Sequence, residues 1–562
     1  MKVPSRNIAF WAKEIIDECT VSRPKRLMEY RFWRDVFFTG SDNDIPSKHN
    51  RCYSHIDKLS SYLFSPSDVR FQVDFDEATR DPFSKWANAA SNYLNRQFAR
   101  RNCDITFAEA NEWSLVKGAT IMKLVWSRSG LEPWVIQPEN FGVLREDIED
   151  LDRQDAFTHT FYLTPTQFRR LLGDRRDRTE LMARVAASYS ADAESAISNA
   201  GGHDINLGGL AGIGIPGIYA PTQNATGTVS WTTAAPVPML APEVVQRLIR
   251  IDDLWVWNDE REDWTTIRYV DPGIVIEGEM MHRNLSDVPG EHPFVKVCSN
   301  PTPGYFWGRS EIANIWPNQK MLSQRLTDID QIFRMQAKPS RAIIGGSGIT
   351  DERARMLLTP GGVLTDSSPT TKVETFKPEM PSGALEYLGY LDSCFDEAAG
   401  FTAMTNGQGE SGVRAGTHAN TLLRTSTPRL RDRALVTERQ AAQFGDLCLK
   451  MLRAKDPEII YTDDDKGEIF LANLPEDASV TVDSHTSSPA FSGDNQNLLF
   501  ALAKAGAVGP QELIEGTHPP REEILIARLH ARDKAHQKQL EELRQQDPEQ
   551  WAKAISGSGR RH

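Results

Sequence analysis

The fold is decided by one stretch, NPTPGYFWGRSEIANIWPNQKMLSQRLTDIDQIFRMQAKPS, which runs from Asn300 to Ser340. Pro317 suits the first turn of an α-helix, because a residue there needs no backbone N–H. Apolar residues then recur at steps of four, three and four, which predicts one apolar face made of Leu322, Leu326, Ile329 and Phe333. The helix should end before Pro339, giving a rod of about 30 Å.

A small strand unit follows this rod, and a second helix follows the unit. The segments SRAIIGG, GGVLTD and TKVETFKP lie between Gly and Pro turns and predict short strands within residues 340–381. The second helix should end at Gly400 and present Leu385, Leu388, Asp392 and Phe395 on one side. The two helices then flank the strand unit like the legs of a hairpin, whose broad surface neighbouring subunits of a ring would bury.

The next stretch, NGQGESGVRAG from Asn406 to Gly416, matches the dinucleotide-binding pattern G-x-G-x-x-G. That pattern works where a strand delivers the glycines and a helix N-terminus receives the pyrophosphate. Here a helix precedes the glycines, and a return strand within about 30 residues is missing. We therefore interpret the stretch as a flexible loop between two helices.

A very long helix is expected from about Thr417 to Lys455, with a kink at Pro428. Its apolar positions recur at steps of seven and four: Leu423, Leu430, Ala434, Ala441, Cys448 and Leu452. Strands should follow in PEIIYTD, GEIFLA and ASVTVDS, and the end of the chain reads as charged helices.

The N-terminal half predicts an α+β body. Residues 1 to about 125 are mostly helical in pattern, and strand patterns occupy residues 132–165 and 245–300. TPTQFRRLLG predicts a short helix with a Thr cap. Between these regions, residues 186–242 are rich in Ala, Gly, Ser, Thr and Pro, which favours an exposed flexible spacer over a binding loop.

Composition narrows the class of protein. The 562 residues carry a formal net charge of -13, whereas a protein that grips DNA through its phosphates is usually basic. The six cysteines form no close pair, so we expect buried free thiols in a reducing cytosol and no zinc site. MKVPSRNIAFWAKEIIDE reads as an amphipathic helix and not a signal peptide, and no apolar run reaches the roughly 20 residues of a membrane span.

The sequence shows no catalytic constellation. It has no H-E-x-x-H and no G-x-S-x-G, and Gly345–Gly348 lacks the Lys-Ser/Thr of a phosphate loop. Three consecutive carboxylates, Asp463–Asp465, favour a solvated turn over a cation site. We expect no enzyme activity, no cofactor and no bound metal.

The order of these parts resembles the portal proteins of tailed bacteriophages. NEWSLVKGATIMKLVW followed by VIQPENFGVL is similar to the family's N-terminal body, and the quoted Asn300–Ser340 stretch is similar to its entry into the first stem helix, with Gly308, Arg309 and Ser310 as the turn. The resemblance covers residues from about 80 to 500 and rests on the order of parts, since no single motif is diagnostic.

The resemblance implies a ring, usually of twelve subunits, at one capsid vertex of the virion, assembled in the host cytoplasm. Double-stranded DNA would pass through the ring during packaging and ejection. The implied partners are other copies of the chain, the terminase large subunit, the major capsid and scaffolding proteins, and head–tail adaptor or tail proteins. The implied parts are the wing (1–308, with the insertion at about 186–242, and 417–508), stem helices (309–336 and 382–400), the clip (337–381), the tunnel loop (401–416) and a C-terminal crown or barrel (509–562).

A channel that passes a genome must not hold it, and negative walls repel phosphates. Within the implied tunnel loop, Arg414 is the first candidate to touch the DNA backbone, and on the stem Arg325, Arg334 and Lys338 are further candidates; ion pairs are the structural alternative for each. The glycines that would let the loop follow the DNA are Gly407, Gly409, Gly412 and Gly416. Three alternatives stay open: another virion structural or adaptor protein, a nucleotide-binding enzyme, and a sequence-specific DNA-binding protein, which the charge disfavours.

Overall fold

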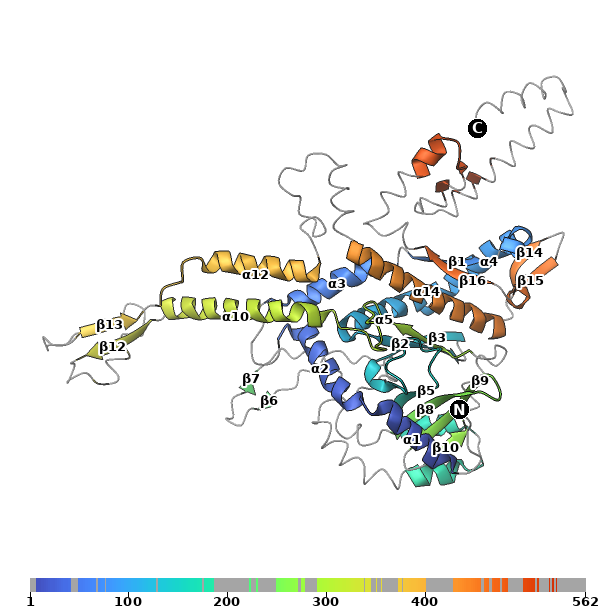
Figure 1. The fold of residues 1–562 in the computed structure, drawn as a ribbon, viewed down its shortest axis with the longest axis horizontal. Coiled ribbons are helices and arrows are strands. Elements are labelled where there is room, and N and C mark those ends of the chain that lie inside the picture. The colour runs from blue at the N-terminus through green and yellow to red at the C-terminus, as the bar shows by residue number, and fades with distance from the viewer. Residues whose placement is uncertain are drawn as a thin grey trace, which may run out of the picture.

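The computed structural model combines helices and antiparallel sheets in one body, from which a long arm projects (Figure 1). The residues that it describes are 7–41, 49–66, 69–75, 77–127, 130–173, 176–185, 222–223, 229–230, 249–270, 274–277, 291–337, 339–344, 350, 355, 372–376, 378–400, 428–455, 459–463, 467–475, 478–483, 499–510, 513–514, 525, 528–529 and 532.

The N-terminal region is helical, as its apolar periodicity predicts. Asn50 caps one of these helices, since its side-chain oxygen accepts a hydrogen bond from the backbone N–H of Tyr53 at 3.1 Å. The helices are α1 (Ile8–Thr20), α2 (Arg23–Thr39), α3 (Arg51–Leu63), α4 (Glu77–Arg101) and α5 (Cys103–Lys117).

Two antiparallel sheets follow, which confirms the expected mixed class. A three-stranded sheet has the order β11-β2-β3, and a five-stranded sheet has the order β10-β9-β8-β5-β4. The strands are β2 (Thr120–Ser127), β3 (Gly130–Ile136), β4 (Phe141–Val143), β5 (Ala156–Leu163), β8 (Ile249–Asn258), β9 (Asp263–Val270), β10 (Ile274–Glu277) and β11 (Phe294–Val297).

Between β5 and β8 the chain forms the expected short helix, α6 (Pro165–Leu172). Thr164 and Gln167 make a full capping box at its start. Of the 186–242 insertion, the structure describes the paired segments β6 (Thr222–Gln223) and β7 (Val229–Ser230), and the rest lies outside the described residues. A single 3-10 turn, η1 (Pro138–Asn140), precedes β4.

The long helix α14 (Pro428–Lys455) packs along the core of the body (Figure 1). The described members of its expected apolar stripe are all buried: Leu430, Ala434, Ala441, Cys448 and Leu452. The expected helical segment 417–427 and Leu423 lie outside the described residues, so the kink at Pro428 stays a prediction.

Residues far apart in sequence share this core. Strand β1 (Arg70–Asp74) pairs antiparallel with β16 (Ser479–Asp483), and Gly445 of α14 lies so close to both that a Cβ there would meet Val480 at 2.7 Å and Phe71 at 2.9 Å. The remaining C-terminal elements are β14 (Ile459–Asp463), β15 (Gly467–Phe470) and η2 (Leu471–Asn473). The region after α14 therefore belongs to the same core as the N-terminal helices.

The arm consists of α10 (Ile312–Ala337), the strand pair β12 (Ser340–Ile344) and β13 (Lys372–Phe376), and α12 (Ala384–Ala399) (Figure 1). The two helices lie side by side, as the hairpin prediction required, and the strands lie at the far end. GGVLTD, the 401–416 glycine segment and most of residues 509–562 lie outside the described residues.

The prediction that Pro317 begins the first arm helix is wrong. The helix begins five residues earlier, at Ile312, and Pro317 lies inside it. Ile312, Ile315 and Trp316 are buried against α2, α3, α5 and α14. This burial stabilises the first turn of the helix and outweighs the loss of the one backbone hydrogen bond that Pro317 removes.

Candidate functional site

The arm carries about half of the large hydrophobic residues that are exposed in the described part of the chain, nine of nineteen. Leu385 is 70% exposed and Tyr390 is 62% exposed, although a helix in a monomer normally turns such side chains inward. The nine are Met321, Phe333, Met335, Ile344, Val373, Phe376, Leu385, Tyr387 and Tyr390.

The apolar stripes of the two arm helices are buried only near the body. Leu322 is 5% exposed, whereas Phe333, about three turns further along the same predicted stripe, is 56% exposed. On the side of α12 that was predicted to carry Leu385, Leu388, Asp392 and Phe395, Phe395 is buried and Leu385 is exposed; the buried residues of this helix are Leu391, Phe395 and Ala399. Burial follows contact with the body, so the outer part of the arm has apolar residues without a described neighbour to cover them.

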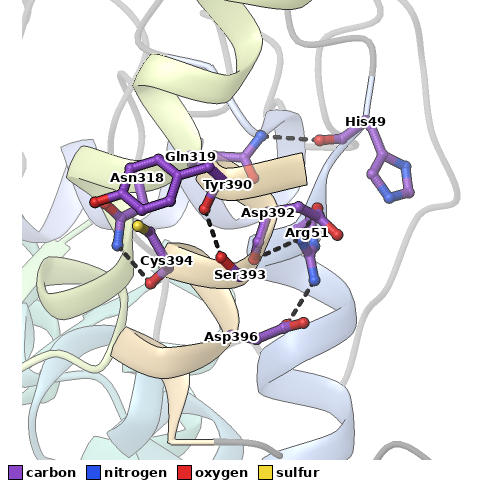
Figure 2. A network of polar contacts seen from close by, with 9 residues as sticks. All are labelled: His49, Arg51, Asn318, Gln319, Tyr390, Asp392, Ser393, Cys394 and Asp396. Atoms are coloured by element: carbon purple, nitrogen blue, oxygen red, sulfur yellow. Dashed lines mark hydrogen bonds and ion pairs between the residues drawn. The ribbon is translucent and has the colours of Figure 1, made fainter. Parts of the chain in front are cut away.

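A polar network holds the root of α12 against α3 (Figure 2). Arg51, the first residue of α3, forms ion pairs with both Asp392 and Asp396, the second at 2.6 Å. Its guanidinium also lies over the ring of Phe395, 4.4 Å from the centroid. One arginine thereby fixes two successive turns of α12 through charge and cation–π contacts.

The root of α10 is tied to the same region by two amide side chains (Figure 2). Asn318 donates a hydrogen bond to the carbonyl oxygen of Cys394 at 3.1 Å, and Gln319 donates one to the carbonyl oxygen of His49 at 2.8 Å. These contacts join α10 directly to α12 and to the segment before α3. The two helices therefore leave the body at a fixed relative position.

A buried ion cluster joins the start of α10 to α14. Glu311 accepts a hydrogen bond from Arg433 at 2.8 Å, and His55 of α3 lies 3.6 Å from its other carboxylate oxygen. Burial alone would raise the pKa of Glu311, but hydrogen bonding to His55 and the charge of Arg433 outweigh it and lower the pKa to about 2. Glu311 is thus ionised at neutral pH in the interior.

Two of the four predicted DNA-contacting cations have described positions. Arg325 pairs with Asp328 at 2.7 Å, and Arg334 pairs with Asp330 at 2.9 Å, in each case along α10 itself. Both arginines are exposed, so the ion-pair alternative applies to them in the single chain. Lys338, Arg414 and the glycines Gly407, Gly409, Gly412 and Gly416 lie outside the described residues.

Sequence reasoning missed the residues that anchor the arm. Arg51, Glu311 and Arg433 carry no motif, and they come together only in the folded chain. A signal was present for one of them, because Arg433 lies beside Ala434 of the apolar stripe predicted for the long helix. A charged residue at such a position must be paired when it is buried.

A second titratable cluster lies between the two sheets and was also missed. Asp253 accepts hydrogen bonds from Arg268 at 2.6 Å and lies 3.5 Å from the Lys123 ammonium, which is 3.3 Å from a ring nitrogen of His159. Burial lowers the pKa of Lys123 to about 8 and lowers the pKa of His159 well below its usual value. All four residues are at most 4% exposed, so a substrate has no access to them in this conformation.

Among the described residues, no group of three or more His, Cys, Asp or Glu side chains is placed to hold a metal ion. All six cysteines are free; five are buried, as expected, and Cys394 is half-buried. Within the same described part of the chain, no helix combines the length and apolar character needed to cross a membrane.

The fold thus defines a mixed α and β protein with a projecting two-helix arm. No protein-family model matches the chain, and no curated protein matches it. A solved structure described as the neck of an empty GTA particle, computed with C6 symmetry, is similar to it over 84% of this chain and 90% of that chain, with 10% identity and a TM-score of 0.38. At this identity and TM-score we draw nothing about function from the similarity.

Proposed function

We propose that the chain is a portal subunit: copies of it form a ring at one capsid vertex through which double-stranded DNA is packaged and later ejected. The observation that carries the proposal is the arm with its nine exposed apolar residues. An exposed apolar surface of this kind marks an interface between proteins. In a closed ring each arm has a neighbour on both sides, so both of its flanks become buried.

The charges of the two arm helices support side-by-side packing of successive subunits. Helix α12 contains four carboxylates, Glu386, Asp392, Asp396 and Glu397, and no Lys or Arg; Asp392 and Asp396 are paired with Arg51 of the same chain, which leaves Glu386 and Glu397 available to a neighbour. Helix α10 contains three cations against two carboxylates. Opposed surfaces of opposite charge favour one register over others. We place α12 of one copy against α10 of the next.

The net charge of -13 suits a channel that conducts DNA without retaining it, because like charge repels the phosphates. Arg414 and the glycines of residues 401–416 would form the point of contact with the DNA backbone. For Arg325 and Arg334, a phosphate contact has to compete with the carboxylate on the same helix. The chain conducts and does not catalyse, and it needs no cofactor.

The far end of the arm is the proposed docking surface for other components. Ile344, Val373 and Phe376 of the β12–β13 pair are exposed there, at the point most distant from the body (Figure 1). We propose that this end receives the terminase large subunit during packaging and a head–tail adaptor afterwards. The body would face the major capsid and scaffolding proteins in the virion.

The test is the mass and shape of the purified full-length protein, by light scattering and electron microscopy of the same fraction. Twelve copies of a 63.1 kDa chain make about 757 kDa, and cyclic symmetry requires a central hole. Rings wide enough for duplex DNA support the proposal. A compact dimer or tetramer without a hole overturns it, and rings too narrow for a duplex favour another virion structural or adaptor protein.

A further inference from the structure

Strand β11 has an edge that no other strand covers in the described part of the chain. It pairs with β2 on one side, and the N–H of Leu124 donates to the carbonyl oxygen of Pro293 at 2.8 Å. Backbone groups alternate in direction along a strand, so Phe294, Lys296 and Cys298 present theirs to the opposite edge. That edge faces α14.

Among the described residues, side chains form hydrogen bonds with the backbone of this edge only at its two ends. Gln440 of α14 bonds both the N–H and the carbonyl oxygen of Cys298, each at 3.0 Å, as a paired strand would do. His292 accepts a weak hydrogen bond from the N–H of Phe294 at 3.4 Å. The backbone N–H and carbonyl of Lys296 between them have no hydrogen-bond partner among the described residues.

A groove of about 520 Å³ runs along the same edge. The wall of the groove opposite β11 is one face of α14. The residues on this face recur about every third or fourth position along the helix. From the first to the last of them the helix rises about 21 Å, which is the length of about six extended residues. They are Val436, Arg439, Gln440, Gln443, Asp446, Leu447 and Lys450.

The lining of the groove is acidic in balance. Five carboxylates face three cations, and the Lys296 ammonium is already held by the carbonyl oxygens of Glu149 at 2.5 Å and Phe306 at 3.1 Å. Lys450 is paired with Glu291, and Asp152 lies 2.9 Å from a ring nitrogen of His292. Asp446 and Glu149 accept hydrogen bonds from the backbone N–H groups of Val480 and Gly304, which leaves Asp150 as the groove carboxylate without such a partner among the described residues. The five carboxylates are Glu149, Asp150, Asp152, Glu291 and Asp446.

From this geometry we propose that the groove binds an extended, Lys- or Arg-bearing segment of a partner polypeptide, which adds as a strand to the edge of β11. The open N–H and carbonyl of Lys296 supply main-chain hydrogen bonds, and alternate side chains of the segment lie against the acidic wall and against α14. Binding of this kind depends on backbone hydrogen bonds and on charge. The groove should therefore bind an extended basic segment in preference to a helix. It is independent of the ring proposal.

The test uses the full-length protein and fluorescein-labelled heptapeptides in an anisotropy titration at low ionic strength. The peptide RVKVRVK should bind. The same peptide with alternate backbone amides N-methylated should bind at least tenfold more weakly, and so should EVEVEVE. Equal binding of the methylated peptide, or no binding of RVKVRVK, overturns the proposal.

Variants of the groove locate the binding. Gln443→Trp fills the middle of the groove from the exposed surface of α14 and should weaken RVKVRVK binding at least tenfold, whereas Leu435→Trp, outside the groove on the same helix, should leave it unchanged. Asp150→Lys should weaken binding several-fold, and Glu260→Lys in the β8–β9 turn should not. Thermal melts establish that each variant is folded.

Unaltered binding by Gln443→Trp overturns the assignment to this groove. If Gln443→Trp instead lowers the assembled mass measured by light scattering, the occupant is a second copy of the chain, and the partner-segment proposal is wrong. If the protein binds the peptide normally but does not form rings, the proposed function is rejected and the groove proposal is not.

Discussion

Glu311 and Arg433 form a buried ion pair 2.8 Å long that joins the residue before the arm helix α10 to the first turns of α14, 122 positions later in the chain. The Glu311 side chain is fully buried, and that of Arg433 is 9% exposed. Because α14 also packs in the core of the body, this pair ties the direction of the arm to the core.

The pair should make stability depend on pH in a specific range. The folded pKa of Glu311, about 2, lies below its ordinary value of 4.5. Its ionisation therefore stabilises the fold fully above pH 4.5 and loses that contribution as the pH falls toward 2. Two to three pKa units correspond to about 3 kcal/mol. We expect Glu311→Gln to lower Tm at pH 7, and we expect the difference from the wild type to shrink below pH 4.5 and to be small near pH 2, as measured by calorimetry. A constant difference at all pH values would contradict this assignment.

Gly308 should tolerate no side chain. Its φ is +64°, and a Cβ there would lie 2.5 Å from the sulfur of Cys298 and 2.9 Å from the carbonyl oxygen of Asn300. We expect Gly308→Ala to lower the free energy of unfolding by about 2–4 kcal/mol. The control is Gly304→Ala, which has a φ of +70° and open space around it, and which should cost about 1 kcal/mol. Denaturant titration of both variants measures the difference.

Removing apolar side chains from the arm should prevent assembly without unfolding the chain. In the triple variant Leu385→Ser, Tyr387→Ser and Tyr390→Ser, the altered residues are exposed and the buried root is intact. We expect loss of the ring in light scattering and a thermal melt of the monomer close to that of the wild type. The matched control replaces three exposed residues outside the arm, Phe10, Val21 and Met28, by serine and should assemble normally. Equal assembly of both triple variants would reject the arm as the interface.

Arg51 of α3, which anchors the arm, should matter more than the ion-paired arginines of the arm itself. Its side chain is 17% exposed and bridges two carboxylates and a ring, whereas Arg325 is 49% exposed with one partner. We expect Arg51→Ala to increase amide hydrogen exchange across Ala384–Ala399 and to cost about 1–2 kcal/mol. Arg325→Ala should change stability by less than about 0.5 kcal/mol. The same exchange rates in both variants would show that the arm root does not depend on Arg51.

The glycines of residues 401–416 test the proposed contact with moving DNA. Replacing Gly407, Gly409, Gly412 and Gly416 with alanine should impair DNA packaging while rings still form, because alanine restricts backbone rotation. Arg414→Ala should also alter packaging without altering assembly. In vitro packaging with a purified motor measures both effects. Normal packaging by the glycine variant would refute the role of loop flexibility.

Hydrophobic periodicity predicted the structure correctly where the buried face of an element is set by that element's own residues. The described part of the α14 stripe is buried from Leu430 to Leu452, and the Thr cap predicted for the helix in TPTQFRRLLG is present at Thr164. It failed at Pro317, which lies inside the helix that it was predicted to begin. Whether a helix continues, and which of its faces is covered, depends on neighbours that other parts of the chain supply.

By itself, the sequence determined which segments form helices and strands and that two helices enclose a small strand pair, because side-chain periodicity and caps act over a few residues. Only the tertiary structure decided that Arg51 meets Asp396, that Glu311 meets Arg433, and that β1 pairs with β16. These partners are separated by more than a hundred positions. Their meeting is set by how the whole core packs, and no local pattern records it.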